Sequence, residues 1–168
     1  MTQRLSDARD LVESVRDPEM PVVTLADLGV VRGVQVSGDG CVVVTITPTY
    51  TGCPAIATIR GDIAKALQCH GFRDVTVNLS FSPAWSSDWI TAEGRRKLIQ
   101  NGYSAPGQQP QRRVGPVPLA LTGPDRVVTC PRCGSRCNRL LAEFGSTLCK
   151  ALYQCSTCLE PFDHIKEI

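Results

Sequence analysis

Two Cys-x-x-Cys pairs near the end of the chain carry its strongest indication of chemistry. They are Cys130 with Cys133 and Cys155 with Cys158, and 21 residues separate the two pairs. Each pair can place two thiolates on one tight turn, and two such turns can close a tetrahedron around one metal ion. Four thiolates suit both zinc and iron, so the pattern predicts a four-cysteine metal site without deciding the metal.

The residue after each pair shapes the turn that presents the sulfurs. Gly134 follows the first pair and suits the positive φ that such a turn often needs. Leu159 follows the second pair, and a side chain there disfavours that conformation. The two turns are therefore predicted to differ in backbone conformation.

Three further residues of this region could bind a metal. Cys137 and Cys149 lie between the two pairs, and His164 follows them. We assign the ligands to the two pairs, because they alone have the x-x spacing, and we leave the roles of these three residues open. A thioredoxin-like redox pair would need a βαβ context that this region lacks.

A second candidate site lies upstream at Cys53. Pro54 fits the first position of a helix, and an apolar stripe at helical spacing predicts a helix over residues 54–68. Cys53 is then the N-cap, where the helix dipole and free N–H groups lower the pKa of a thiol. A reactive or metal-binding thiolate and a buried, inert cysteine are the two interpretations left open.

Acids and other cysteines in the first hundred residues have more ordinary interpretations. Asp17, Glu19 and Asp27 lie on predicted loops, where spacing alone favours turn and cap roles. Cys41 and Cys69 occupy apolar positions of predicted elements and are expected in the core.

The elements that must position these residues follow from hydrophobic periodicity. The predicted order is helix, strand, strand, helix, strand, which indicates an α+β domain over residues 1–102. A hairpin turn joins the first two strands, and a short helix in residues 83–102 is expected to pack on this domain. The predicted helices cover residues 3–16 and 54–68, and the predicted strands cover residues 30–36, 41–47 and 74–81.

The composition changes after residue 102. Residues 103–125 contain five prolines and three glycines without periodicity, which indicates an extended linker. Residues 126–168 hold the four-cysteine site and are predicted to form a small metal ribbon. Short strands are expected over residues 126–129, 148–154 and 162–168.

Charge and hydropathy exclude several classes of function. The net charge is +2, and residues 126–168 carry six basic and four acidic side chains, too few cations for a nucleic-acid-binding stripe. No apolar run reaches membrane-spanning length, and the polar first ten residues do not resemble a signal peptide. We therefore expect a cytoplasmic protein whose nine cysteines stay reduced, with no membrane or nucleic-acid partner.

Three strings in the first hundred residues resemble the MIP18 family, whose members act in iron–sulfur cluster assembly. They are Asp17-Pro-Glu, Asp27-Leu-Gly and Thr47-Pro-Thr-Tyr-Thr-Gly-Cys-Pro. The resemblance implies a small α+β domain with a mixed sheet and two main helices. It also implies that Cys53 holds iron or an iron–sulfur cluster transiently, with Asp17, Glu19 and Asp27 near it, and whether Cys53 carries a metal, a cluster or a persulfide stays open.

The tail resembles one subgroup of that family, the D proteins of phenylacetate degradation. The strings that carry this likeness are Cys130-Pro-Arg-Cys-Gly-Ser, Phe144-Gly-Ser-Thr-Leu-Cys-Lys-Ala-Leu-Tyr-Gln-Cys and Cys158-Leu-Glu-Pro-Phe-Asp. The likeness covers nearly the whole chain and implies that the four-cysteine site is a structural zinc ribbon. The subgroup has threonine near position 137 and an aromatic residue near position 164, which weakens a ligand role for Cys137 and His164.

The resemblance also implies a function. It points to an accessory, non-catalytic subunit of the multicomponent 1,2-phenylacetyl-CoA epoxidase. The implied partners are a di-iron oxygenase, a structural subunit and a flavin/iron–sulfur reductase. The implied role is assembly of iron or an iron–sulfur cluster in one of them. The client and the oligomeric state stay open, a homodimer included.

Two alternatives remain beside this role. One is a purely structural subunit that bridges epoxidase components through the ribbon. The other is a thiol enzyme acting on CoA esters with Cys53 as its nucleophile. That enzyme lacks a base, because His70 lies at the far end of the helix after Cys53, about 25 Å away at about 1.5 Å per residue.

Overall fold

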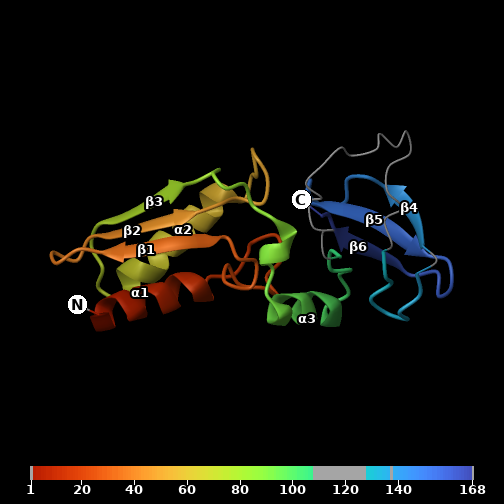
Figure 1. The fold of residues 1–168 in the computed structure, drawn as a ribbon, viewed down its shortest axis with the longest axis horizontal. Helices are drawn as coiled ribbons and strands as arrows, with labels where there is room; N and C mark the ends of the chain where they lie inside the picture. Colours follow the sequence, from red (N-terminus) through yellow and green to blue (C-terminus); the bar gives the residue numbers. More distant parts are fainter. Residues whose placement is uncertain (1, 108–127, 137, 168) are drawn as a thin grey trace, which may run out of the picture.

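The first part of the chain is a three-stranded mixed sheet with two helices (Figure 1). The computed structural model describes residues 2–107, 128–136 and 138–167. Strand order is β1-β2-β3, with β1 antiparallel and β3 parallel to β2. This confirms the predicted α+β class and order of elements. They are α1 (Thr2–Ser14), β1 (Val31–Val36), β2 (Val42–Ile46), α2 (Ile56–Cys69) and β3 (Val75–Leu79).

One face of this sheet is buried because its strands alternate apolar residues toward the helices. Val34, Val44 and Val77 pair across the three strands, and all three are at most 7% exposed. The helix α2 turns an apolar stripe toward them, formed by Ile59, Ile63 and Leu67. Burying side chains of this size contributes about 1.5–3 kcal/mol each.

The predicted short helix after residue 83 is present as two pieces, η1 (Ser87–Trp89) and α3 (Ala92–Gln100). Thr91 caps α3, since its hydroxyl accepts a hydrogen bond from the N–H of Gly94 at 2.9 Å. Leu98 of α3 is fully buried in the same core as the sheet. The helix therefore packs on the first domain, as expected.

The last part of the chain is a second, antiparallel sheet of order β4-β5-β6. Its strands are β4 (Asn138–Ala142), β5 (Lys150–Cys155) and β6 (Pro161–Ile165). The sequence predicted the last two approximately and missed β4, whose adjacent exposed leucines lack alternation. The strand expected over residues 126–129 is wrong at 128 and 129, because Val128 packs beside the cysteines instead; 126 and 127 lie outside the described residues.

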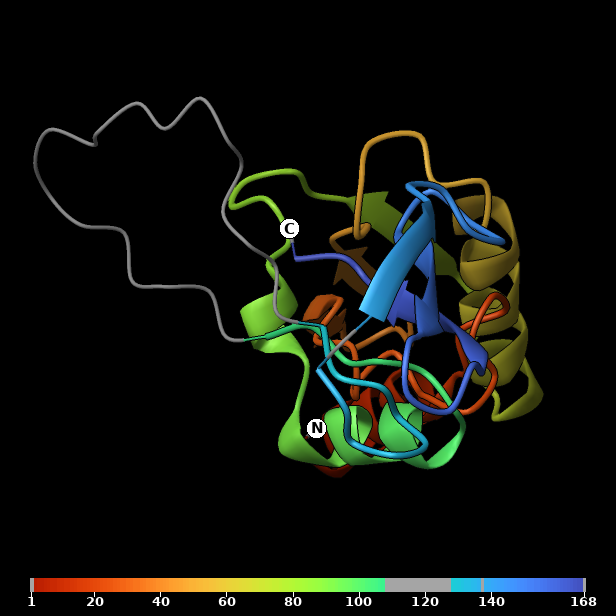
Figure 2. The ribbon, with the colours of Figure 1, turned by 90° about the vertical axis from the view of Figure 1, so that its right-hand side faces the viewer.

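Residues 103–107, the start of the predicted linker, run beside β6. The N–H of Ser104 donates to the carbonyl of Asp163 at 2.8 Å, and the N–H of Ile165 donates to the carbonyl of Ser104 at 2.9 Å. Figure 2 views the molecule from the ribbon side, with β4–β6 in front of the first sheet. Residues 108–125 of the predicted linker lie outside the described residues.

Among the helices that the structure describes, none has both the length and the apolar character needed to cross a lipid bilayer.

Candidate functional site

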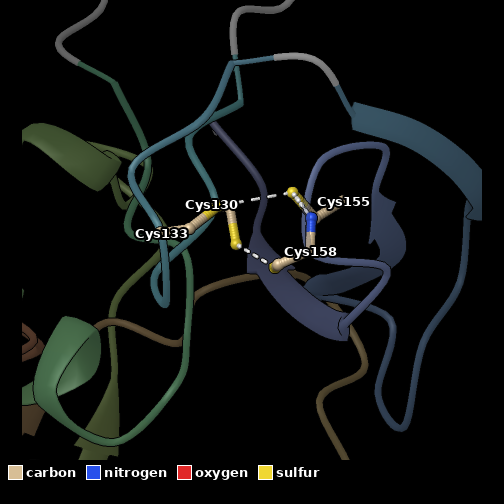
Figure 3. Close-up of side chains that lie close together, drawn as sticks. All are labelled: Cys130, Cys133, Cys155 and Cys158. Carbon is tan, nitrogen blue, oxygen red and sulfur yellow. Dashed lines mark hydrogen bonds between the residues drawn. The ribbon is translucent and has the colours of Figure 1, made fainter.

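The four predicted cysteine ligands come together at one end of the ribbon (Figure 3). All four sulfurs lie within 4.8 Å of one another. The Sγ atoms of Cys130 and Cys158 are 3.8 Å apart, and those of Cys133 and Cys155 are 3.5 Å apart. A tetrahedron with metal–sulfur bonds of about 2.3 Å has edges of about 3.8 Å. The four thiolates therefore fit one tetrahedrally coordinated metal ion.

The two turns that present these sulfurs have the same backbone conformation. The N–H of Gly134 donates to the carbonyl of Cys130, and the N–H of Leu159 donates to the carbonyl of Cys155, both at 3.0 Å. Gly134 has φ 73° and Leu159 has φ 62°. The prediction that the second turn differs is wrong, because the same backbone hydrogen bond closes both turns and holds Leu159 in the left-handed conformation as well.

Backbone N–H groups prepare one sulfur for metal binding. The N–H groups of Cys158 and Thr157 donate to Sγ of Cys155, each at 3.4 Å. The hydrogen bond from Cys158, followed by the one from Thr157, lowers the pKa of the Cys155 thiol to about 6. These two donors favour the thiolate of Cys155, which is the form that binds metal.

A second cluster of metal-binding groups surrounds a small cavity where the ribbon meets the first domain. Its lining includes Asp17, Glu19, Thr47, Cys53 and Cys149. The cavity has a volume of about 20 Å³. That is room for one water molecule or one bare ion.

Cys53 lies in this lining but not at the predicted place in the helix. The N-cap of α2 is Ala55, two residues later, and it makes no side-chain cap. Burial raises the pKa of the Cys53 thiol and outweighs the hydrogen bond from the N–H of Ala55, while the charge of Glu19 raises it further. The prediction that a helix terminus lowers this pKa is therefore wrong, and Cys53 is a neutral thiol near neutral pH.

The two acids of the cavity are also shifted toward their protonated forms. Asp17 is 7% exposed, and its Oδ1 accepts hydrogen bonds from the N–H groups of Glu19 at 2.8 Å and Met20 at 2.9 Å. Burial raises the pKa of Asp17 despite these bonds. Burial and then the charge of Asp17 raise the pKa of Glu19. A cation entering the cavity would favour the charged forms of both groups.

Cys149 brings a second thiol to the same cavity, from the turn that leads into β5. Its Sγ lies 4.0 Å from Oε2 of Glu19, and the side chain is 5% exposed. The ammonium of Lys150 donates to the carbonyl of Glu19 at 3.1 Å and so ties the ribbon to the loop of the acids. Sequence reasoning left Cys149 without a role, because 130 positions separate it from Glu19.

Two buried hydroxyl groups lie close to Cys53 and the cavity. Oγ1 of Thr47, a residue that is 1% exposed, lacks a hydrogen-bond partner among the described residues, whereas the hydroxyl of Tyr50 interacts with the thiol of Cys53. Burial, followed by the charge of Cys53, raises the pKa of Tyr50. A buried hydroxyl such as that of Thr47 usually has a partner, so a bound water or ion is expected there.

Asp27 is not among the residues that line the cavity. Its Oδ2 accepts hydrogen bonds from the ammonium of Lys97 at 2.7 Å and from the N–H of Thr24 at 2.9 Å. The turn that begins at Asp27 also lies close to η1. Any side chain at Gly29 would place its Cβ 2.5 Å from the carbonyl oxygen of Trp89. These contacts attach the segment of α3 to the first domain.

The other candidates lie elsewhere. His164 is 1% exposed, and its Nδ1 is 3.1 Å from Oγ of Ser104, so it packs β6 against the start of the predicted linker. Cys137 lies outside the described residues. Cys69 is exposed at the end of α2 and Cys41 is only partly buried, so the expectation that both are core residues is wrong.

Comparison with known families divides the chain into two matched regions. Residues 5–79 match the family model described as "Iron-sulfur cluster assembly protein". Residues 115–166 match the "PaaD zinc beta ribbon domain". The structure of a DUF59 domain (domain of unknown function) from Bacillus anthracis is similar to the first region. It has a TM-score of 0.54 and 27% identity, and covers 58% of this chain and 92% of its own.

Two relatives share substantial identity with the chain. The putative D component of the 1,2-phenylacetyl-CoA epoxidase of Escherichia coli (strain K12) is 45% identical over 156 residues, which is 93% of this chain and 88% of that protein. A "Fe-S protein maturation auxiliary factor" of Porphyromonas gingivalis is 36% identical over 97 residues, which is 57% of this chain and 91% of that protein.

Proposed function

The chain belongs to the PaaD family, which contains the epoxidase D component and is marked by the zinc beta ribbon, and on that premise we propose how it acts. It is an accessory, non-catalytic subunit of a 1,2-phenylacetyl-CoA epoxidase. It holds iron at Cys53 and passes it to a partner during assembly of the partner's iron or iron–sulfur centre. The partners are a di-iron oxygenase, a structural subunit and a flavin/iron–sulfur reductase.

The observation that carries this proposal is the small cavity lined by Cys53, Asp17 and Glu19. A thiol and two carboxyl groups are protein ligands that iron accepts, and all three become better ligands when a cation displaces their protons. Ligands that hold their protons bind metal less tightly, which suits a carrier that must release its cargo.

The size of the cavity opposes the thiol-enzyme alternative. A pocket for a small organic ligand usually measures about 300–1,000 Å³, whereas this cavity measures about 20 Å³. His70 is exposed beyond the end of α2, where its Nδ1 bonds to the carbonyl of Ala66 at 2.8 Å. A CoA ester therefore finds neither room nor a histidine base beside Cys53.

We assign zinc to the four-cysteine site as a structural ion. Four thiolates in a closed tetrahedron leave no open position for substrate, which is the usual arrangement of structural zinc. Five large apolar side chains of the ribbon are exposed by 43% or more, a surface suited to contact with partner subunits. They are Leu140, Leu141, Phe144, Leu148 and Leu159. This surface supports structural bridging as a second candidate function.

The Cys53→Ser substitution tests the carrier function. The protein is produced together with the other epoxidase components, and the purified partners are assayed for iron content and epoxidase activity. We expect iron and activity in one partner to fall several-fold, because serine is a poor ligand for iron. The matched control is Cys69→Ser, which changes an exposed cysteine at the end of α2.

The same experiment separates the two candidate functions. If the partners copurify with the Cys53→Ser protein and keep their full iron content and activity, the carrier function is wrong. A bridging role alone would then account for the subunit.

A further inference from the structure

We propose that Cys149 is the second thiolate ligand of the Cys53 site, so that the ribbon and the first domain together bind one divalent metal ion. This inference rests on the proposed function for the identity of that ion as Fe²⁺. It gives the ribbon a direct part in the site, beyond its own four-cysteine metal and any contact with partners.

The first support is the convergence of four acidic groups on one cavity. Cys53 and Cys149 reach it from opposite parts of the chain, and Asp17 and Glu19 reach it from the loop after α1. Sγ of Cys149 is 4.0 Å from Oε2 of Glu19, a separation that one shared metal ion can span. The volume of about 20 Å³ limits the occupant to a single ion.

The second support is that the carboxylates have no direct ion-pair partner. Among the described residues, neither the buried Asp17 nor the half-buried Glu19 takes part in an ion pair. Lys150 is the nearby cation, and its ammonium bonds to the carbonyl of Glu19 and the hydroxyl of Ser146. Its charge lowers the pKa values of both carboxyl groups, but burial outweighs it, so a divalent ion in contact with them would stabilise their charged forms.

The third support is the orphaned hydroxyl of Thr47. Its Oγ1 belongs to a fully buried residue that lines the cavity, and it has no partner in the described part of the chain. A bound ion that keeps one water ligand would supply the missing partner.

The donor set favours a borderline or soft divalent ion. Two thiolates exclude Mg²⁺ and Ca²⁺, which prefer oxygen ligands, while one or two carboxylates suit Fe²⁺, Co²⁺ and Zn²⁺. Each thiol gives its proton to solvent as it becomes a ligand.

The ribbon holds Cys149 in place through its neighbours. The N–H of Lys166 donates to the carbonyl of Cys149 at 3.0 Å, and Oγ1 of Thr147 lies 3.0 Å from its sulfur. Lys150 is 2% exposed, and its ammonium stands 5.3 Å from the ring centre of Tyr103. These contacts fix the sulfur toward the cavity, so the site is complete only when the ribbon is folded and docked.

Cobalt titration tests the ligand set in the full chain. The protein is first loaded with one equivalent of zinc for the four-cysteine site, and Co²⁺ is then added without oxygen. The thiolate-to-cobalt charge-transfer absorption reports how many sulfurs bind the cobalt, and zinc released into solution reports any exchange at the ribbon. The variants are Cys149→Ser, Cys53→Ser, the double variant and the control Cys69→Ser.

We expect one further Co²⁺ in the wild-type protein and in Cys69→Ser. Each single variant at the site should lose about half of the charge-transfer intensity, and the double variant should lose nearly all of it. Loss of an outer-shell partner alone costs about 10–100-fold in metal affinity, so each single variant should lose at least about that much. In wild-type protein, bound Co²⁺ should also protect Cys53 and Cys149 together from alkylation, a readout that needs no variant.

Two results would overturn the inference: no second Co²⁺ in wild-type protein, or full charge-transfer intensity with Cys149→Ser that retains its ribbon zinc. The outcome is separable from that of the carrier function. If Cys53→Ser abolishes iron delivery while Cys149→Ser binds Co²⁺ normally, only the ligand assignment fails. If both sulfurs bind Co²⁺ while partner iron is unaffected by either variant, only the carrier function fails.

Discussion

Asp17 and Asp27 are both buried, yet their neighbours shift their pKa values in opposite directions. Burial raises the pKa of Asp17, and its two backbone N–H bonds do not compensate. Burial acts in the same direction on Asp27, but the hydrogen bond and charge of Lys97 outweigh it and lower the pKa. Asp27 therefore has a structural role as the partner of Lys97, whereas Asp17 is available to bind a cation.

Asp27→Asn should therefore destabilise the protein in a pH-dependent way. A carboxylate whose pKa is lowered by folding stabilises the folded state above the pKa of the unfolded group, about 3.9. That contribution is lost as the pH falls through the lower folded-state pKa. We expect Asp27→Asn to cost about 1–3 kcal/mol at pH 7 and little near pH 2. Urea unfolding at several pH values measures this difference.

The exposed Asp62 supplies the control for that experiment. Asp62→Asn should unfold like the wild-type protein at every pH. An Asp27→Asn penalty that stays constant from pH 7 to pH 2 would contradict the assigned role of the Lys97 pair.

The two Cys-x-x-Cys turns show how a metal site constrains local structure. Gly134 and Leu159 take the same left-handed conformation, and neither meets a packing obstacle that would explain it: a Cβ on Gly134 has no neighbour within 4 Å, and Leu159 is 67% exposed. The strain at Leu159 is therefore backbone strain, which metal binding by the four cysteines would offset.

Reciprocal substitutions at these turns should have opposite effects on the ribbon. Leu159→Gly removes the side chain that disfavours the left-handed conformation, so the metal-bound ribbon should gain about 1 kcal/mol. Gly134→Ala introduces the same strain and should cost about 1 kcal/mol. Zinc affinity in a chelator competition measures both. If both substitutions changed the metal affinity in the same direction by the same amount, the φ angle would not control these turns.

At the scale of the whole molecule, the ribbon covers one side of the Cys53 cavity. Cys149 and Lys150 of the ribbon contact the loop of Glu19. Ser104, which follows the first domain, pairs with β6 of the ribbon. We expect folding of the ribbon to depend on metal at the four-cysteine site, because so small a sheet has little apolar core of its own. Loss of the four-cysteine metal should therefore open the distant cavity as well.

Removal of the metal from the four-cysteine site should raise the reactivity of Cys53. A strong chelator unfolds the ribbon, withdraws Cys149 and exposes Cys53 to solvent, so its alkylation rate should rise several-fold. Mass spectrometry of alkylated peptides follows each cysteine separately. The exposed Cys69 is the internal control and should react equally fast before and after chelation. An unchanged rate at Cys53 would mean that the ribbon does not cover it.

Some of this organisation could be predicted from sequence because it rests on local periodicity and spacing. Period-two and period-3.6 patterns predicted the strands and helices of the first domain, and the x-x spacing predicted the four cysteine ligands. The division into residues 1–102, 103–125 and 126–168 stays a prediction.

Tertiary structure alone decided the rest, because burial and long-range contacts set the properties of a side chain. The pKa of Cys53 is raised rather than lowered, since its thiol is buried beside Glu19 and the helix starts later than predicted. Cys149 carried no local pattern, yet folding places it beside Glu19, 130 positions away. The sequence determined which residues could bind metal, and the fold decided which of them share one cavity.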